Sequence, residues 1–223
     1  MPAVDNVSSF GSNGVGPFTW SHTCSGTDRL LRVTTAHFDS SDIVTSVTYN
    51  GVALTAVPSG STNNGQYYIT AYYLIAPDAG TYDIVVTVSG NVFDFGAGAT
   101  SYTDAHQTTP LGTAVTATGT STTPSVTVSS AADELVDDGL VIIHGGTLSV
   151  GAGQTQRWNA IASSGFIKYA GSTEGGAAST TMSWSNSSSQ TWAIVAVPIK
   201  PTGGGSGGPN ITGAHYQYRK RRL

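Results

Sequence analysis

The sequence predicts an all-β protein, a two-sheet antiparallel β-sandwich with a jelly-roll or related Greek-key topology. Only 10% of the 223 residues are charged, and the chain contains 28 glycines and 9 prolines. A helical bundle is excluded, because helices keep their outer faces in water with Lys, Glu and Arg. Short β-branched and aromatic runs instead recur at intervals of about 8 to 12 residues, which is typical of sandwiches and barrels.

The first half of the chain contains the clearest strand patterns. Apolar and polar residues alternate on both sides of Asn50-Gly51, a dipeptide that favours a hairpin turn. The segment Pro77-Asp78-Ala79-Gly80 predicts another turn. The predicted strands are 30–36, the two arms of a hairpin over 44–57, then 67–76, 81–89 and 97–103.

The second half continues in the same manner, with predicted strands at 113–117, 125–129, 139–144, 157–163, 165–169, 180–185 and 190–198. Segment 131–138 alone has fair helix propensity, but it is too short for more than a turn or two, so we expect a short crossing between sheets. The sequences of 1–110 and 111–200 show no internal repeat, and no linker lies between them. The sequence therefore predicts one sandwich domain over 1–201.

A different kind of segment follows this domain. Residues 202–209 are a Gly/Ser-rich linker, and residues 210–223 are a basic tail. All thirteen acidic residues precede residue 175, whereas four of the nine basic residues lie within the last five positions. The tail predicts a partner-binding device that uses Tyr216, Tyr218, Arg219, Lys220, Arg221 and Arg222. A solvated basic end is the alternative, and the acidic body argues against a nucleic-acid ligand.

No motif for enzymatic chemistry stands out. The Gly-x-Ser-x-Gly elbow of hydrolases is absent, and His144 before Gly145-Gly146 is interpreted as a turn histidine rather than part of an oxyanion corner. Carboxylates gather at Asp39 and Asp42 and again over 133–138, but without the spacing of a calcium loop. We therefore predict no catalytic residue, no metal and no cofactor, and structural calcium at these carboxylates is the alternative. The single cysteine, Cys24, cannot form an intramolecular disulfide and is expected to be a partly buried thiol.

Aromatic residues offer one further kind of site. Exposed tryptophans could stack on sugar rings, and Trp158 and Trp184 are the candidate glycan contacts. Tyr72 and Tyr73 are neighbours in a strand and must point to opposite faces, so at most one of them can share such a platform. Core or inter-subunit packing is the alternative for all of these rings.

The N-terminal residues show neither the basic region nor the apolar run of a signal peptide. No run of about 18 apolar residues occurs anywhere, so no membrane association is expected. These features predict synthesis in a host cytoplasm without a leader.

Four segments carry a resemblance to a known family: 30–33 (LLRV), 44–54 (VTSVTYNGVAL), 72–86 (YYLIAPDAGTYDIVV) and 101–110 (SYTDAHQTTP). Over about residues 20–200 the chain resembles a β-sandwich domain of virion-associated proteins of tailed bacteriophages, found also in bacterial surface proteins. The resemblance implies an accessory structural or binding module without catalytic residues. It does not extend to the basic tail.

Together these observations predict a non-enzymatic virion structural protein, a capsid decoration or head-fibre subunit anchored to the particle through its termini. Its partners would be other virion proteins, such as the major capsid or a tail protein, and it would form a homo-oligomer such as a trimer. The alternative is a carbohydrate-binding or adhesin module that recognises surface glycans.

Overall fold

The computed structural model describes residues 1–203, and every structural statement below refers to these residues. All their regular elements are strands, so the predicted all-β fold class is confirmed. The N-terminal half contains β1 (Ala3–Val15), β2 (Phe18–Cys24), β3 (Leu30–Phe38), β4 (Val44–Tyr49), β5 (Val52–Ala53), β6 (Thr55–Asn63), β7 (Tyr67–Ile75), β8 (Gly80–Val88) and β9 (Asn91–Thr103). The C-terminal half contains β10 (Val115–Ser121), β11 (Ser125–Val128), β12 (Leu135–Ile143), β13 (Leu148–Val150), β14 (Thr155–Ile161), β15 (Ile167–Gly175), β16 (Thr180–Asn186) and β17 (Gln190–Ile199).

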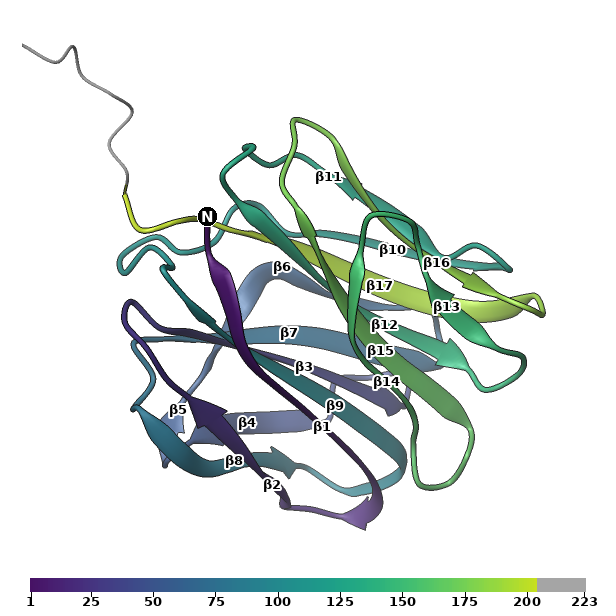
Figure 1. The fold of residues 1–223 in the computed structure, drawn as a ribbon. Coiled ribbons are helices and arrows are strands. Elements are labelled where there is room, and N and C mark those ends of the chain that lie inside the picture. The colour runs from purple at the N-terminus through teal and green to yellow at the C-terminus, as the bar shows by residue number, and fades with distance from the viewer. Residues whose placement is uncertain (204–223) are drawn as a thin grey trace, which may run out of the picture.

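These strands form four antiparallel sheets instead of the two that the sequence predicts (Figure 1). The N-terminal half supplies an outer N sheet, β2-β8-β4-β5, and an inner N sheet, β1-β9-β3-β7-β6. The C-terminal half supplies an inner C sheet, β10-β17-β12-β15-β14, and an outer C sheet, β11-β16-β13. The order β1-β9-β3-β7 opposite β2-β8-β4-β5 is that of a jelly roll. The chain is therefore two jelly rolls in tandem.

The second jelly roll repeats the first strand for strand. Replacing β1–β4 by β10–β13 and β6–β9 by β14–β17 turns one pair of sheet orders into the other, and only β5 has no counterpart. The registers agree as well. Strand β3 pairs with β7 and β9 in the same register in which β12 pairs with β15 and β17. Both edge strands, β6 and β14, carry an irregularity at the same place.

The two inner sheets pack face to face around a pseudo-two-fold axis. Strand β3 faces its counterpart β12, β1 faces β14 as β10 faces β6, and β9 faces β15 as β17 faces β7. Exchanging the halves turns each of these pairs into another or into itself. The arrangement is that of an isologous dimer interface, built here within one chain. Since β3 faces β12, the axis passes between these two central strands.

Glycines let the inner sheets approach closely. A Cβ added at Gly98 of β9 would lie 2.0 Å from Cε2 of Trp158, and one added at Gly171 would lie 2.1 Å from Cζ2 of the same ring. Gly96 similarly faces the ring of Tyr169. Because two large aromatic rings of the C-terminal half occupy the space above small residues, the interface is filled by shape as well as by apolar area.

One ion pair crosses this interface near the pseudo-two-fold axis. Arg32 and Asp137 are the third residues of β3 and β12, and Nη2 of Arg32 lies 3.0 Å from Oδ1 of Asp137. Both side chains are buried, and Nη1 of Arg32 also donates to the Tyr72 carbonyl. Tyr102 donates its hydroxyl to Asp137, and burial with this neighbouring carboxylate raises the pKa of Tyr102 well above 10.0. The two residues of the ion pair therefore occupy equivalent positions in the two halves, although one is an arginine and the other an aspartate.

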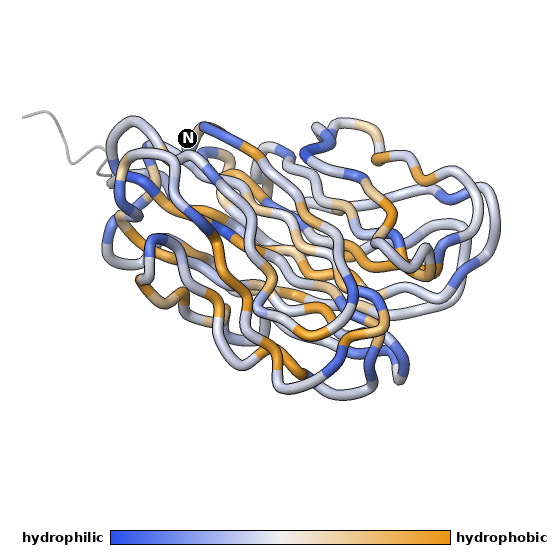
Figure 2. The backbone as a smooth tube through the Cα atoms, turned by 90° about the horizontal axis from the view of Figure 1, so that it is seen from below, coloured by the Kyte–Doolittle hydropathy of each residue, from blue (hydrophilic) through white to orange (hydrophobic). Residues whose placement is uncertain are grey.

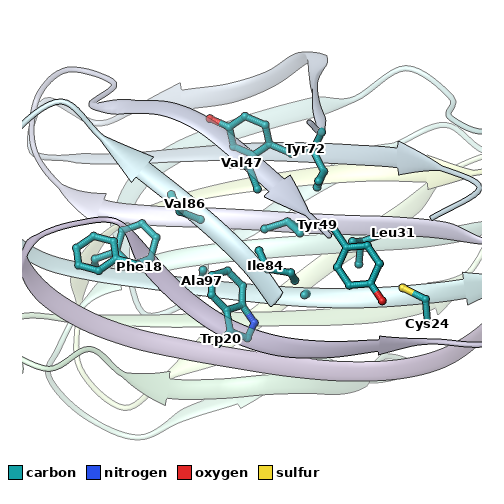
Figure 3. Close-up of a cluster of buried hydrophobic side chains, with 14 of the residues drawn as sticks. Phe18, Trp20, Cys24, Leu31, Val47, Tyr49, Tyr72, Ile84, Val86 and Ala97 are labelled. Atoms are coloured by element: carbon teal, nitrogen blue, oxygen red, sulfur yellow. The ribbon is translucent and has the colours of Figure 1, made fainter. Parts of the chain in front are cut away.

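Each half also has a core between its own inner and outer sheets. Figure 3 shows the N-terminal core, in which Trp20, Tyr49 and Ile84 of the outer N sheet face Leu31 and Ala97 of the inner N sheet. Cys24 lies in this core as a free thiol that is fully buried, where the sequence predicts partial burial, and burial raises its pKa. Figure 2 shows the hydrophobic segments running through the interior, with hydrophilic segments at the turns.

Several elements differ from the sequence prediction. Strands β1, β2, β6 and β13 are absent from it. The Ser, Asn and Gly content of β1 and β6 masks their alternation, and β13 has only three residues, whereas β2 does alternate, with Phe18, Trp20, His22 and Cys24 on one face. The expected crossing over 131–138 is wrong in its second part, since β12 begins at Leu135. Two consecutive aspartates are typical of a loop, but Asp137 and Asp138 of β12 are each buried against a polar partner.

Candidate functional site

Both ends of the described chain lie at one end of the molecule, which we call the proximal end (Figure 1). Ala3 pairs with Thr103, Pro201 pairs with Ala105, and the amide of Thr202 donates to the Asp104 carbonyl. The opposite, or distal, end is formed where β3 ends and where β9 and β15 begin. Because the strands run between these ends, the distal end is the part of the molecule farthest from the chain termini.

Three phenylalanines meet at the distal end, and we call them the phenylalanine cluster. Phe38 ends β3, Phe93 lies near the start of β9, and Phe166 lies in the turn before β15. Their ring centroids are 5.2 to 5.6 Å apart with steep interplanar angles. Phe93 is 50% exposed and Phe166 is 47% exposed, although a cluster of this size would normally be covered. The two halves of the chain thus contribute jointly to an exposed aromatic surface.

A hollow of about 300 Å³ adjoins the phenylalanine cluster. Phe93 borders it, and the polar side chains on its lining are Asn13, Asn91 and Ser164. Nδ2 of Asn13 donates to Oγ of Ser164 over 2.9 Å, and Oγ of Ser164 donates to the Phe93 carbonyl over 2.6 Å. We call this space the distal hollow. Its lining has amide and hydroxyl groups and no charged side chain.

Asp94 holds the turn that carries Ser164 and Phe166. This carboxylate is fully buried, and it accepts hydrogen bonds from the backbone amides of Ser164 (2.9 Å), Phe166 (2.8 Å) and Ile167 (3.0 Å). His144 supports the same turn, because its amide bonds the Phe166 carbonyl and its Nδ1 lies 2.9 Å from the Gly165 carbonyl. A residue of the N-terminal half thus fixes a loop of the C-terminal half.

We predict that Asp94→Ala lowers the free energy of unfolding by about 3 kcal/mol, because three backbone amides lose their carboxylate acceptor. Amide hydrogen exchange at Ser164, Phe166 and Ile167 should accelerate far more than exchange in the outer C sheet. Urea unfolding with exchange measured by NMR tests both effects. Unchanged protection at these three amides would contradict the role given to Asp94. Asp83→Ala is the control, since this exposed carboxylate of β8 accepts no hydrogen bond from a backbone amide among the described residues.

The other hollows have different chemistry. One of about 450 Å³ lies at the proximal end between the β6 bulge and the connection between the halves, and Tyr73, Pro110 and Lys200 are among its lining residues. Another, of about 410 Å³, lies beside β14 and includes Gln156 and Lys168. None of the three hollows is lined by Asp, Glu, His or Cys.

The predicted glycan contacts do not lie on a surface. Trp158 is 7% exposed between the inner sheets, and Trp184 is 1% exposed in the core of the C-terminal half. Neither ring can stack on a sugar, because other side chains of the interior cover both of them. The predicted partner-binding residues Tyr216, Tyr218, Arg219, Lys220, Arg221 and Arg222 lie outside the described residues. Three aromatic side chains of the described residues are exposed instead: Phe93, Phe166 and, on the outer N sheet, Tyr82. The sequence analysis did not single out the two phenylalanines, because each stands alone in the sequence.

The acidic clusters have structural roles. Asp39 accepts bonds from the amide and hydroxyl of Ser41, and Asp42 accepts the amide of Val44, so both shape one loop. Asp137 and Asp138 are adjacent in β12 and point to opposite faces of the inner C sheet. No group of three or more His, Cys, Asp or Glu side chains within residues 1–203 could hold a metal ion.

Two buried titratable groups, His22 and Asp138, should make the free energy of unfolding depend on pH in opposite directions. Burial lowers the pKa of His22 to about 4, and its Nδ1 lies 2.8 Å from Oγ of Ser8. Because the unfolded imidazole binds its proton first, stability is lost as the pH falls from about 6.5 to about 4. Burial raises the pKa of Asp138 to about 7, although Trp184 and Ser172 donate to the carboxylate. Because the folded carboxyl keeps its proton longer, stability is lost as the pH rises from about 4 to about 7.

We therefore expect His22→Gln to remove the loss at low pH and Asp138→Asn to remove the loss at neutral pH. Urea unfolding at pH 4, 5.5 and 7 for the two variants and the parent protein measures this. Between pH 4 and 6.5 the stability of Asp138→Asn should rise more steeply than that of the parent, and the stability of His22→Gln less steeply. Parallel profiles for all three proteins would contradict the assignment.

Comparison with known proteins gives no assignment. No family model matches the chain, and no curated protein or solved structure matches it. Among residues 1–203 there is also no helix with the length and apolar character needed to cross a membrane. The resemblance to phage virion domains therefore stays a prediction.

Proposed function

We propose that this protein is a non-enzymatic structural module of a tailed-phage particle, a capsid decoration or head-fibre subunit that is held at its proximal end. The observation that carries this proposal is the common location of both described termini. A module held there would present its distal end to the surroundings. The linker and basic tail continue from this same end, at Pro201.

The buried polar groups support a structural role. Each of the buried carboxylates Asp94, Asp137 and Asp138 accepts hydrogen bonds from the protein itself, Asp137 and Asp138 from buried side chains and Asp94 from backbone amides of a turn. A catalytic carboxylate would instead face a cleft, where substrate could reach it. The tandem jelly roll also agrees with such a role, because viral capsid proteins use jelly rolls widely, as do lectins.

Attachment can be tested with particles that lack the protein. Particles purified from phage in which this chain has been deleted are mixed with the full chain and then sedimented. The full chain should sediment with the particles, whereas a chain that ends at residue 212 should stay in the supernatant with an unchanged melting temperature. Equal sedimentation of both would end the role given to the tail. Failure of the full chain to bind any particle would end the proposed function.

A second variant separates charge from aromatic contact. Replacing Arg219, Lys220, Arg221 and Arg222 by alanine keeps Tyr216 and Tyr218. Binding should fall at least tenfold and should lose most of its salt dependence, since screening weakens exposed ion pairs.

A further inference from the structure

The distal end combines features that fit one class of ligand. We propose that the phenylalanine cluster and the distal hollow form a binding site for neutral carbohydrate, built jointly by the two halves of the chain. This inference goes beyond the proposed function, because the site would bind sugar whether or not the proximal end is attached to a particle.

The aromatic part of the site offers apolar faces. Phe93 and Phe166 are about half exposed, and their rings lie edge to face at 5.2 Å with an interplanar angle of 82°. The C–H faces of pyranose rings are apolar and flat, so they can cover such rings while their hydroxyls stay in contact with polar groups. Phe38 packs against both rings and fixes them from below.

The polar part of the site offers neutral donors and acceptors. Asn13, Asn91 and Ser164 are among the residues that line the distal hollow beside Phe93. The Ser164 hydroxyl already donates its hydrogen to the Phe93 carbonyl, so the two asparagines are the source of donors for a ligand. An amide both donates and accepts hydrogen bonds, and a sugar hydroxyl does the same. Because no charged side chain lines the hollow, a carboxylate or sulfate group of a ligand would gain no ion pair there. The chemistry therefore selects neutral sugars over sialylated or sulfated ones.

The site is held in shape before any ligand arrives. Asp94 fixes the turn of Ser164 and Phe166 through three backbone amides, and Asn13 reaches across the halves to Ser164. Preorganisation of this kind lowers the entropy lost on binding.

The experiment uses the full chain and a glycan array with neutral hexose, N-acetylhexosamine and sialylated oligosaccharides. The best neutral oligosaccharide is then titrated into ¹⁵N-labelled protein up to about 10 mM, because single sugar sites commonly bind weakly. We expect shifts at the side-chain amides of Asn13 and Asn91, and at least a tenfold loss of affinity in Phe93→Ala and in Phe166→Ala. Sialylated oligosaccharides should bind no better than their neutral counterparts.

Tyr82→Ala is the matched control, since this aromatic is 37% exposed but lies on the outer N sheet. It should bind sugar like the parent protein, and all three variants should keep their fold by circular dichroism. The proposal is overturned if no neutral oligosaccharide binds, or if binding survives both phenylalanine replacements. It is equally overturned if these replacements abolish a self-association of the chain while no sugar binds, because a second copy would then be the occupant.

Discussion

Asp137→Asn should lower the free energy of unfolding by about 3 to 5 kcal/mol, because it leaves the Arg32 guanidinium buried between the inner sheets without its counter-charge. The amide has nearly the size of the carboxyl, so packing changes little. For a chain of this length the expected fall in melting temperature is of the order of 10 °C. Arg32→Met should cost a similar amount, because it leaves the carboxylate buried instead.

A double variant distinguishes a charge effect from a general sensitivity of this position. Arg32→Met combined with Asp137→Asn removes both charges, keeps an acceptor oxygen for the Tyr102 hydroxyl and should recover most of the loss, since neither partner is then a buried, unpaired charge. Urea unfolding of the three variants gives the coupling free energy. A double variant that is no more stable than either single variant would show that the pair does not act as a unit.

The position of the Arg32–Asp137 pair also affects which halves can pack against one another. Arg32 and Asp137 occupy equivalent places on β3 and β12, which face one another at the pseudo-two-fold axis. If two N-terminal halves were to pair in the same way, Arg32 would meet a second Arg32. The opposite charges therefore favour the pairing of unlike halves, which is a form of discrimination by repulsion.

Gly98→Ala should destabilise the protein by about 3 kcal/mol, at the upper end of the usual range for overpacking. The added Cβ would lie 2.0 Å from Cε2 of Trp158, and that ring is held against Gly171 on its own sheet. The ring cannot move away without separating the inner sheets. Gly90→Ala is the matched control and should be nearly neutral, because a Cβ there would meet no atom within 4 Å.

Truncation of the ring should suppress this effect. Trp158→Leu alone is expected to cost about 3 kcal/mol through the cavity that it leaves. In that background, Gly98→Ala should cost less than about 1 kcal/mol, since the leucine can yield to the new methyl group. The double-mutant cycle measures the difference. Equal costs of Gly98→Ala in both backgrounds would contradict a direct contact between residue 98 and the ring.

Local sequence determined the strands whose pattern is self-sufficient. The alternation on both sides of Asn50-Gly51 predicts the β4–β5 hairpin, and both turn residues have positive φ as that turn requires. The long apolar runs of β7 and β17 were equally visible. The edge strands β1 and β6 were not, because each leaves one side unpaired in its sheet and tolerates serine, asparagine and glycine, whereas the edge strands β10, β11 and β14 overlap predicted strands.

The repeat of the two jelly rolls was hidden for a physical reason. A strand order and a register are preserved by hydrogen bonds between backbones, which do not depend on side-chain identity. Side chains diverge as long as the cores stay filled, so β3 and β12 share a position but carry Arg32 in one and Asp137 in the other. Self-similarity of sequence is therefore lost before self-similarity of structure.

By itself, the sequence determined the all-β class, the unpaired thiol of Cys24 and the basic tail, since composition and short-range alternation are local properties. Only the tertiary structure decided that there are four sheets, that Trp158 and Trp184 are interior, and that Phe93 and Phe166 meet at the distal end. These facts depend on pairs of residues far apart in the chain. No local pattern contains them, because they arise only when the two halves close on each other.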